Sequence, residues 1–366
     1  MNNLTIGVVL VTYNRLEELK KAIPCYENQT VKPKYIIVVN NCSTDGTNEY
    51  LKEWMGKTRP YVALEESSTG VETMAERLAH LKEMDADGET NDEPEDGDHN
   101  GLEDGQPHPE YSIVWNNEGN IKKILITIPE NRGGSGGFYA GLKIAATRTD
   151  ANWIWVADDD AFPEQDAFET ADHFVKTNRK MLRKTSAFCG MCVDDNKKAA
   201  TLHQARMKKT IFGRQDLPVS AKEFEKDYFE IDLYTFAGTF LRREALLKAG
   251  LPMEDFFIYQ DDYEHACRMR KLGHIYCVPG VVIHHNDNYM VANEVSWRDY
   301  YASRNIVMMY KWHFDKYSML MRVLRRFLMV CTSRNMKKIK VTITAISDGM
   351  KEKRGLHEVY RPGWKG

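Results

Sequence analysis

Two runs of β-branched and other apolar residues open the chain and predict strands that are buried on both faces. They are TIGVVLVTYN at 5–14 and KYIIVVNN at 34–41, and near-continuous runs of this kind are typical of a parallel sheet. The segments that follow them, 15–29 and 43–54, have the spacing and the turn or cap residues of helices. This β-α-β-α order predicts a parallel sheet whose carboxyl edge carries the functional groups.

After residue 110, further segments continue the alternation of predicted strands and helices. Residues 111–129 predict a hairpin around Asn117 to Asn120 that leads into another buried strand, and 130–148 predict a glycine-rich turn followed by a helix. NWIWVADDD at 152–160 predicts the next strand. YEHACRMRKLG at 263–273 has helical spacing and a glycine stop, and a strand and a basic helical end follow it.

An acidic insert separates the two parts. From Glu83 to Glu110 there are twelve Asp or Glu and no Lys or Arg, with many Gly and Pro, so we expect disorder or a loose surface loop. A short helical stretch at 71–84 precedes it. A calcium loop is the alternative, but the acids fit the EF-hand spacing poorly.

Length and composition predict one large domain with an appendage, because 366 residues with 42% hydrophobic side chains support a sizeable core. We predict an α/β domain over 1–290 and a basic helical region over 291–366. The net charge is only −3, but Lys311 to Arg354 contain twelve Lys or Arg and three acids, which favours an anionic partner. Neither a signal peptide nor an apolar run of roughly 20 residues is evident, so we expect a cytoplasmic protein.

Cys189 and Cys192 form a CxxC motif among seven cysteines. Such a motif can bind zinc or act in redox chemistry, but no second CxxC or nearby His pair completes a zinc site. We favour two ordinary semi-buried thiols.

Asp158, Asp159 and Asp160 follow the apolar run directly and would emerge at the carboxyl edge of the sheet. Asp158 and Asp160 point the same way if the strand persists, with Asp159 facing elsewhere. Adjacent carboxylates repel one another unless a cation or solvent lies among them, and Mg²⁺ or Mn²⁺ prefers such oxygen ligands together with substrate phosphates. A solvated turn before Pro163 is the alternative.

Four glycines, Gly133, Gly134, Gly136 and Gly137, lie in NRGGSGGFYAG and permit close approach of the backbone to a ligand. The following helix can present its N-terminus to an anion. The dinucleotide pattern GxGxxG fits poorly, so we favour a nucleotide-sugar contact, with a purely structural turn as the alternative.

Asp261, Asp262 and Glu264 lie at the start of the predicted helix, where the helix dipole favours acids on structural grounds alone. The strand that follows ends in His284 and His285. An imidazole at a strand end can be a third ligand for an ion held by the aspartates; an ordinary surface histidine is the alternative.

In chain order, VVLVTYNR, VVNNCSTDGT, ENRGGSGGF, WIWVADDDAFP, YQDDYEHACRMRKLG, PGVVIHH and DYYASRN resemble the motif series of inverting family-two glycosyltransferases of the GT-A fold. The chain is most similar to the bacterial galactofuranosyltransferase-like branch, with rhamnosyltransferases close by. The resemblance covers about residues 4–310 apart from the acidic insert. It implies a Rossmann-like, mainly parallel central sheet flanked by helices, with a C-terminal helical extension.

The resemblance also implies roles for the matching positions. The residues implied to contact the nucleotide or the donor sugar are Thr12, Tyr13, Arg15, Asn40, Asn41, Asp45, Asn131, Gly133, Gly134, Gly137, Asp158 and Asp159. The implied ligands of a Mn²⁺ or Mg²⁺ ion are Asp158, Asp160 and His285, and the implied general base is Asp262, with Asp261 beside it. Asn40 replaces the Asp of many relatives, which leaves uridine and thymidine both open.

These roles fit one displacement at an anomeric carbon. A nucleoside diphosphate leaving group needs a cation, and the acceptor hydroxyl needs a carboxylate to take its proton. One base and no protein nucleophile give inversion. The predicted reaction is transfer of galactofuranose from UDP-galactofuranose to a cell-surface polysaccharide or lipid-linked glycan. The alternatives are a rhamnosyltransferase using dTDP-rhamnose, a non-catalytic nucleotide-sugar-binding protein and a dehydrogenase; no nucleic-acid partner is expected.

Residues 315–340 mix Met, Leu, Val and Phe with Arg and Lys at roughly helical spacing. A basic amphipathic helix can lie on an anionic membrane, which would make the protein peripheral on the inner face of the cytoplasmic membrane. The alternative is a helix that packs on the catalytic domain and leaves its basic face in solvent.

Overall fold

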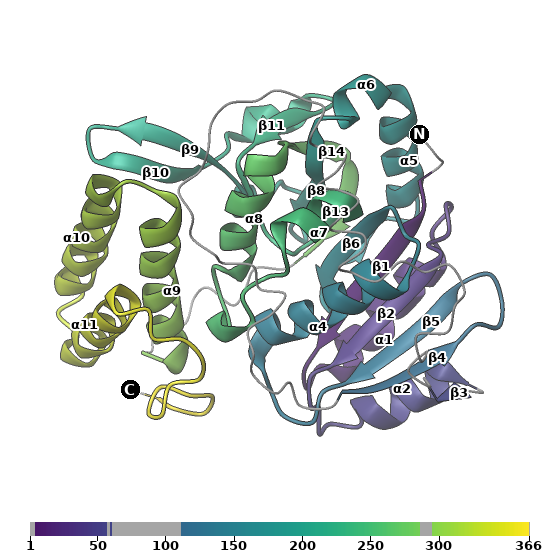
Figure 1. Cartoon of the computed structure of the whole chain (residues 1–366), viewed down its shortest axis with the longest axis horizontal. Helices are drawn as coiled ribbons and strands as arrows, with labels where there is room; N and C mark the ends of the chain where they lie inside the picture. Colours follow the sequence, from purple (N-terminus) through teal and green to yellow (C-terminus); the bar gives the residue numbers. More distant parts are fainter. Residues whose placement is uncertain (1–3, 57–58, 61–110, 286–294, 366) are drawn as a thin grey trace.

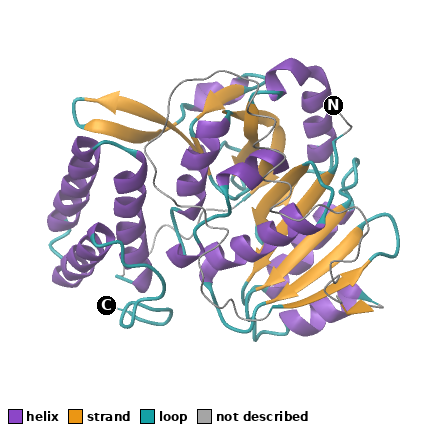
Figure 2. Cartoon of the chain, viewed as in Figure 1, coloured by secondary structure: helices purple, strands orange, loops and turns teal. Residues whose placement is uncertain are grey.

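A mixed β-sheet forms the centre of the molecule (Figure 1 and Figure 2). The computed structural model describes residues 4–56, 59–60, 111–285 and 295–365. Within these residues the sheet has, in spatial order, β11 (Phe229–Ile231), β14 (His274–His284), β8 (Thr185–Val193), β13 (Thr239–Arg242), β6 (Trp153–Asp158), β1 (Ile6–Thr12), β2 (Tyr35–Asn40), β5 (Lys122–Thr127), β4 (Ser112–Asn116) and β3 (Arg59–Pro60). The short β7 (Phe162–Pro163) pairs with β14.

Four neighbouring strands, β6, β1, β2 and β5, are parallel, as the buried apolar runs predict. Their registers place Asn40 opposite Thr12 and Thr127, and Asp158 opposite Val11. The carboxyl ends of the four strands are therefore nearly level, and the polar residues that follow them meet at one edge. β13 lies antiparallel between β6 and β8.

Helices cover both faces of this sheet, and the alternation of side chains along β1 assigns each face. Val9 and Val11 pack in one core with α4, whereas Val8 and Leu10 pack in the other with α1, α2 and α5. The helices of this part of the chain are α1 (Leu16–Glu27), α2 (Thr47–Met55), α4 (Gly133–Arg148), α5 (Ala167–Thr177), α6 (Arg179–Leu182), α7 (Arg243–Ala249) and α8 (Asp261–Leu272).

Helix α4 lies unusually close to β1 because a glycine faces the strand. A Cβ atom at Gly137 would lie 2.3 Å from Cγ1 of Val11, which is inside van der Waals contact. This part of the glycine-rich segment therefore serves helix-to-sheet packing.

A second sheet joins the central sheet to the C-terminal helices. It consists of β10 (Gly213–Pro218), β9 (Gln204–Thr210) and β12 (Leu233–Tyr234). Figure 1 shows the β9–β10 hairpin reaching over α10 (Lys316–Thr332), which lies beside α9 (Trp297–His313) and α11 (Met336–Met350). Short 3-10 turns complete the described elements: η2 (Thr201–His203), η3 (Ala221–Glu225) and η4 (Glu254–Phe256).

The predicted fold class, a GT-A-type α/β sheet with C-terminal helices, is confirmed, and so is the hairpin around residues 117–120, which joins β4 to β5. The acidic insert at 83–110, its calcium-loop alternative, the helix at 71–84 and the boundary between 1–290 and 291–366 lie outside the described residues. That division into two regions stays a prediction. In the described ranges no helix has both the length and the apolar character that crossing a bilayer requires.

Candidate active site

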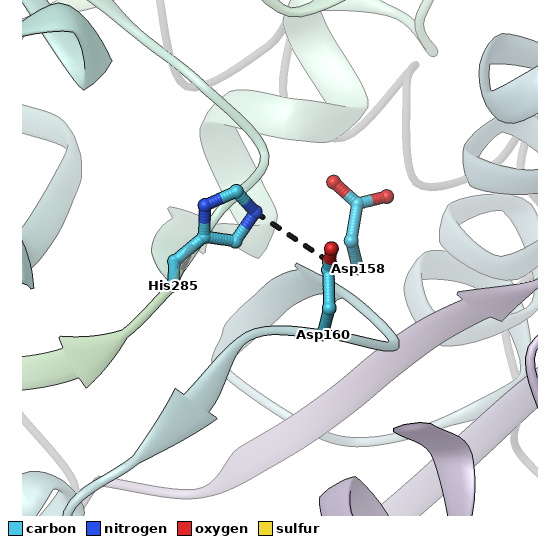
Figure 3. A group of neighbouring side chains, drawn as sticks. All are labelled: Asp158, Asp160 and His285. Carbon is cyan, nitrogen blue, oxygen red and sulfur yellow. Dashed lines mark ion pairs between the residues drawn. The ribbon is translucent and has the colours of Figure 1, made fainter. Parts of the chain in front are cut away.

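The end of β6 brings three predicted metal ligands together. Asp158 is the last residue of the strand and Asp160 lies in the turn after it, while His285 directly follows β14. One ligand atom from each of the three side chains lies within 4.8 Å of the others, and Figure 3 shows them converging. Nε2 of His285 is 3.5 Å from Oδ1 of Asp160, an ion-pair distance rather than a close hydrogen bond.

Asp159 points elsewhere, toward the end of β1. Its Oδ2 accepts a 2.7 Å hydrogen bond from Oγ1 of Thr12, and its Oδ1 lies 3.3 Å from the guanidinium of Arg15. Arg15 also donates to Oδ2 of Asp160 at 2.8 Å. Asp159 thus binds Thr12 and is absent from the group of candidate metal ligands, although it shares Arg15 with Asp160, and a turn, not a continued strand, carries Asp160.

Burial and mutual repulsion shape the protonation of these acids. Burial, followed by the charge of Asp160, raises the pKa of Asp158 to about 7, and burial raises the pKa of Asp159 to about 8 although Arg15 and Thr12 oppose it. Burial would also raise the pKa of Asp160, but His285 and Arg15 outweigh it and lower the pKa. Near neutral pH the metal-free cluster therefore keeps protons on Asp158 and Asp159, and a bound cation would favour their ionised forms instead.

The metal-free protein should lose stability as pH rises because of these shifts. Since the folded-state pKa values of Asp158 and Asp159, about 7 and 8, exceed the ordinary value of about 3.9, the native state binds more protons than the unfolded state between these limits. Their contribution to stability is fully present below about pH 4 and is lost as pH rises through 7 to 8.

Thermal unfolding in EDTA between pH 5 and 8 tests this expectation. The melting temperature should fall with pH in the wild-type protein and fall less in Asp158→Asn, whereas Asp166→Asn, at an exposed position before α5, should follow the wild type. Identical slopes for wild type and Asp158→Asn would contradict the shift.

The donor set fits a divalent ion. Two carboxylates and an imidazole are ligands that Mn²⁺ and Mg²⁺ accept, and the buried Oδ1 of Asp160 has no hydrogen-bond partner among the described residues. The described chain contains no other group of three or more His, Cys, Asp or Glu placed to hold a metal. Cys189 and Cys192 are free thiols on β8, and Sγ of Cys192 donates to the carbonyl of Ala237. Both are fully buried rather than semi-buried as predicted.

Asn41 ties the end of β2 to the loop after β5. Its Nδ2 donates to Oδ1 of Asn131 at 3.1 Å and to the carbonyl of Gly133 at 3.0 Å, and its Oδ1 accepts from the backbone of Arg132. Oδ1 of Asn131 also accepts from the N–H of Gly133. The buried Asn41 is thus already engaged in shaping the loop.

Asn40 and Asp45 organise the loop between β2 and α2. Asn40 is buried and accepts from the N–H of Ser43. Asp45 accepts from the N–H groups of Leu16 and Thr47, so one carboxylate serves the first turns of both α1 and α2. Burial opposes these hydrogen bonds, but they prevail and lower the pKa of Asp45.

The glycine-rich turn begins α4 beside the segment that leads into α8. Gly133 has a φ of +69°, and a Cβ atom there would lie 1.8 Å from the carbonyl oxygen of Phe257. Nothing lies within 4 Å of a Cβ built at Gly134, so this position faces open space at the helix N-terminus. Tyr13, after β1, is likewise exposed.

Asp261 and Asp262 begin α8, on the same side of the sheet edge as the metal-ligand cluster. Burial raises the pKa of Asp261 to about 6. Burial and then the charge of Asp261 raise the pKa of Asp262 well above its ordinary value, and the charge of Asp158 adds to this. The charge of Asp158 acts on Asp262 and that of Asp261 acts on Asp158, so the start of α8 lies near the end of β6.

Arg304 and Asn305 of α9 form a hydrogen-bonded brace behind these acids that the motifs did not reveal. Asn305 of α9 donates to the carbonyls of Phe256, Ile258 and Tyr259, each at 2.9 Å, and its neighbour Arg304 is almost fully buried. Arg304 bonds the carbonyls of Asp255, Phe256 and Gly355 and Oδ1 of Asn305.

This brace holds strained backbone. Phe257, Tyr259 and Gln260 have φ values of +66°, +67° and +68°, and each such residue costs on the order of 1–3 kcal/mol. The strained segment ends where Asp261 begins, so α9 fixes the place of the acidic pair. The only signal in the sequence was DYYASRN, a motif in which no role was assigned to Arg304 or Asn305.

The two histidines after β14 have different surroundings. His284 lies 3.1 Å from Oε1 of Glu164, away from the cluster. The ring of His285 stands edge to face with that of His203, with centroids 5.1 Å apart, and Nδ1 of His203 is 2.8 Å from Oγ1 of Thr235. The predicted choice of His285 over His284 as the residue beside the aspartates agrees with this geometry.

An acidic cluster and a second acidic pair lie at the carboxyl edge of the central parallel strands, the edge at which α/β proteins bind ligands. The chain belongs to glycosyltransferase family 2: residues 7–70 match the profile "Glycosyl transferase family 2" and residues 111–303 match "Glycosyltransferase like family 2". It is therefore a family-2 glycosyltransferase that transfers a sugar from a nucleotide-sugar donor. No curated protein sequence matches the chain.

Solved structures are similar in fold. S. aureus TarS 1-349 in complex with UDP-GlcNAc has 11% identity and a TM-score of 0.53, and the match covers 95% of this chain and 81% of that chain. GalNAc-T7 with UDP, GalNAc and Mn²⁺ has 12% identity and a TM-score of 0.53, with 96% of this chain covered but only 57% of that one. These likenesses support the fold alone.

Proposed function

We propose that the protein is a metal-dependent inverting glycosyltransferase that moves galactofuranose from UDP-galactofuranose to a lipid-linked glycan or cell-surface polysaccharide at the cytoplasmic membrane. The observation that carries the mechanism is the gathering of Asp158, Asp160 and His285 at the strand edge, in electrostatic reach of the partly buried Asp262. The galactofuranosyl donor rests on the motif resemblance, and its test is set out below.

Asp158, Asp160 and His285 would hold the divalent ion, and the bound ion would neutralise charge that develops on the diphosphate leaving group. Arg15, which already bridges Asp159 and Asp160, places a fixed cation at the same edge. Thr12 fixes the direction of Asp159, so the third aspartate keeps Arg15 in place. Tyr13 is exposed beside this group and is available to the nucleotide.

The donor would lie along the loops after β2 and β5. Asn40, Asn41, Asn131 and Asp45 remain the proposed contacts to the nucleotide and donor sugar, and all four also hold the shape of these loops through hydrogen bonds. The open position of Gly134 at the N-terminus of α4 suits approach of the diphosphate or sugar, because helix N–H groups attract anions. Gly133 and Gly137 allow this turn and its packing.

Asp262 would take the proton of the acceptor hydroxyl as that oxygen bonds to the anomeric carbon and the bond to the diphosphate breaks. Its raised pKa suits this task, because a carboxylate in a buried site is a stronger base than one in water. Asp261 raises that pKa further through its charge and would act as a tuning neighbour. With one base and no nucleophile, the anomeric configuration inverts.

A thermal-shift panel tests the donor. UDP-galactofuranose with Mn²⁺ should raise the melting temperature more than Mn²⁺ or the nucleotide sugar alone, since a ligand stabilises the state that it binds. dTDP-rhamnose is the comparison arm, because Asn40 leaves the base open. A larger shift with dTDP-rhamnose would replace the proposed donor, and a donor shift without turnover in the presence of glycan acceptors would favour the non-catalytic binder.

A further inference from the structure

The basic residues of helix α10 predict that its basic face lies in solvent, but the opposite face is the exposed one. Arg322 pairs with Asp216 at 2.7 Å, Arg325 donates to Oε1 of Gln215 at 2.8 Å, and Arg326 donates to Oγ of Ser303 at 3.1 Å. These contacts join α10 to β10 and α9. The predicted basic face therefore packs, in large part, against the protein.

The outward face of α10 is apolar instead. Large side chains repeat at helical spacing and are 36–58% exposed, with Leu320 at 58% and Leu328 at 54%. Its members are Tyr317, Leu320, Leu324, Phe327 and Leu328. Soluble surfaces seldom carry so many large apolar side chains in one stripe, so the stripe indicates an interaction site.

The tip of the β9–β10 hairpin extends this stripe. Ile211 is 82% exposed and Phe212 is 56% exposed. The hydroxyl of Tyr317 donates to the carbonyl of Ile211 at 2.7 Å, and the N–H of Arg214 donates to Oγ of Ser318 at 2.8 Å. The tip is thereby fixed to the first turn of α10 (Figure 1), and two segments about a hundred residues apart form one surface, which we call the hairpin–α10 face.

Charge around the hairpin–α10 face selects its partner. Residues 204–215 and 316–340 contain no Asp or Glu, while the exposed Asp315 caps the first turn of α10, and exposed cations lie in the same two segments as the apolar residues. These cations are Lys208, Lys209, Arg214, Lys316, Arg334 and Lys337. Two copies of the chain joined through this face would bring cations against cations, whereas anionic headgroups would neutralise them while acyl chains cover the apolar side chains.

We infer that the hairpin–α10 face is the surface by which the protein lies on an anionic bilayer, with Ile211, Phe212 and the outward side chains of α10 entering the headgroup boundary. The contact is interfacial, consistent with the lack of a spanning helix among the described residues. This inference deepens the proposed function, on which it rests for the placement of a lipid-linked acceptor, and it replaces the basic face as the membrane contact.

Sedimentation of the full chain with lipid vesicles tests the inference. Vesicles of phosphatidylcholine with phosphatidylglycerol should carry down the wild-type protein, and pure phosphatidylcholine vesicles should carry down much less. Ile211→Asp/Phe212→Asp and Leu324→Asp/Leu328→Asp should each reduce the bound fraction by about tenfold, because each places charges in the apolar boundary. Leu272→Asp, at an exposed position at the end of α8, should bind like the wild type.

Two outcomes would overturn the inference. Wild-type binding by both double variants would show that another surface contacts lipid. A wild-type dimer in size-exclusion chromatography that Leu324→Asp/Leu328→Asp converts to a monomer, without vesicle binding by either protein, would assign the face to a second copy. The thermal shift caused by UDP-galactofuranose and Mn²⁺ should remain in the same variants. If the wild type and all variants lack this shift, the proposed donor is wrong. Vesicle binding would still decide whether the hairpin–α10 face contacts the membrane.

Discussion

Replacing Asp262 with Asn is expected to lower kcat by about 10²- to 10⁴-fold, the range that a general base contributes. The amide has nearly the shape of the carboxylate but cannot accept the proton of the acceptor hydroxyl. Donor binding should persist, because the ligand cluster of Asp158, Asp160 and His285 is unchanged. The measurement pairs initial rates with the thermal shift caused by UDP-galactofuranose and Mn²⁺.

Stability offers an internal check on this variant. Burial and the charges of Asp261 and Asp158 disfavour the ionised form of Asp262 and raise its pKa, so a neutral amide should leave the fold as stable as before or more stable at pH 8. A loss of activity together with a retained melting temperature is therefore chemical and not structural. In the wild type, kcat should rise as pH increases through the raised pKa of Asp262, since the base must be ionised.

Asp150→Asn is the matched control. Asp150 precedes β6 at its amino end, where it pairs with Lys34 and Tyr35, and its replacement should leave kcat unchanged. More than a tenth of wild-type kcat in Asp262→Asn would exclude this residue as the base. If Asp261→Asn then proved inactive, the catalytic role would belong to Asp261.

The sheet and the place of its site could be predicted because they depend on local signals. Runs such as 5–14 and 34–41 are short, near-continuous and rich in β-branched residues, as are strands buried on both faces of a parallel sheet. Once the order of strands was set, the polar residues after each strand had to meet at one edge. The place of Asp158 and Asp160 at this edge followed for the same reason, whereas the turn that carries Asp160 did not follow from the pattern.

Which residues of the site are held by hydrogen bonds within the protein could not be predicted, because a motif gives residue types and not their hydrogen bonds. Asn41 and Asp45 match positions that resemble nucleotide contacts, yet their polar atoms bind the protein's own loops and helix ends. The four glycines of the motif also have different roles. Gly137 packs against Val11, and among the four only Gly134 faces open space. Such assignments depend on neighbours distant in the sequence.

The packing of the C-terminal helices was even harder to predict from the sequence. Polar residues on a helix suggest a solvated face, but Arg304 and Asn305 are buried against the backbone that leads into α8. Helical spacing in α10 gave two faces without saying which one is inward. That choice depends on Asp216 and Gln215, from a hairpin about a hundred residues earlier.

His285→Asn is expected to abolish most of the stabilisation by Mn²⁺ and to lower kcat by about 10²-fold or more, because a metal supplies several kcal/mol of charge stabilisation and each 1.4 kcal/mol is a factor of ten. The variant removes one of the three proposed ligands and also the partner that helps to lower the pKa of Asp160. Calorimetric titration of Mn²⁺ into the protein, with rates measured at saturating metal, tests both effects.

The adjacent residue provides the control for this prediction. His284→Asn makes the same chemical change one position earlier, but His284 faces Glu164 and not the aspartates, so its Mn²⁺ affinity and kcat should stay at wild-type values. Equal affinity in the two variants would remove His285 from the metal site. Wild-type activity that survives exhaustive dialysis against EDTA would contradict the metal requirement itself. Arg15 would then be the cation at the end of β6 that contacts the diphosphate of the donor.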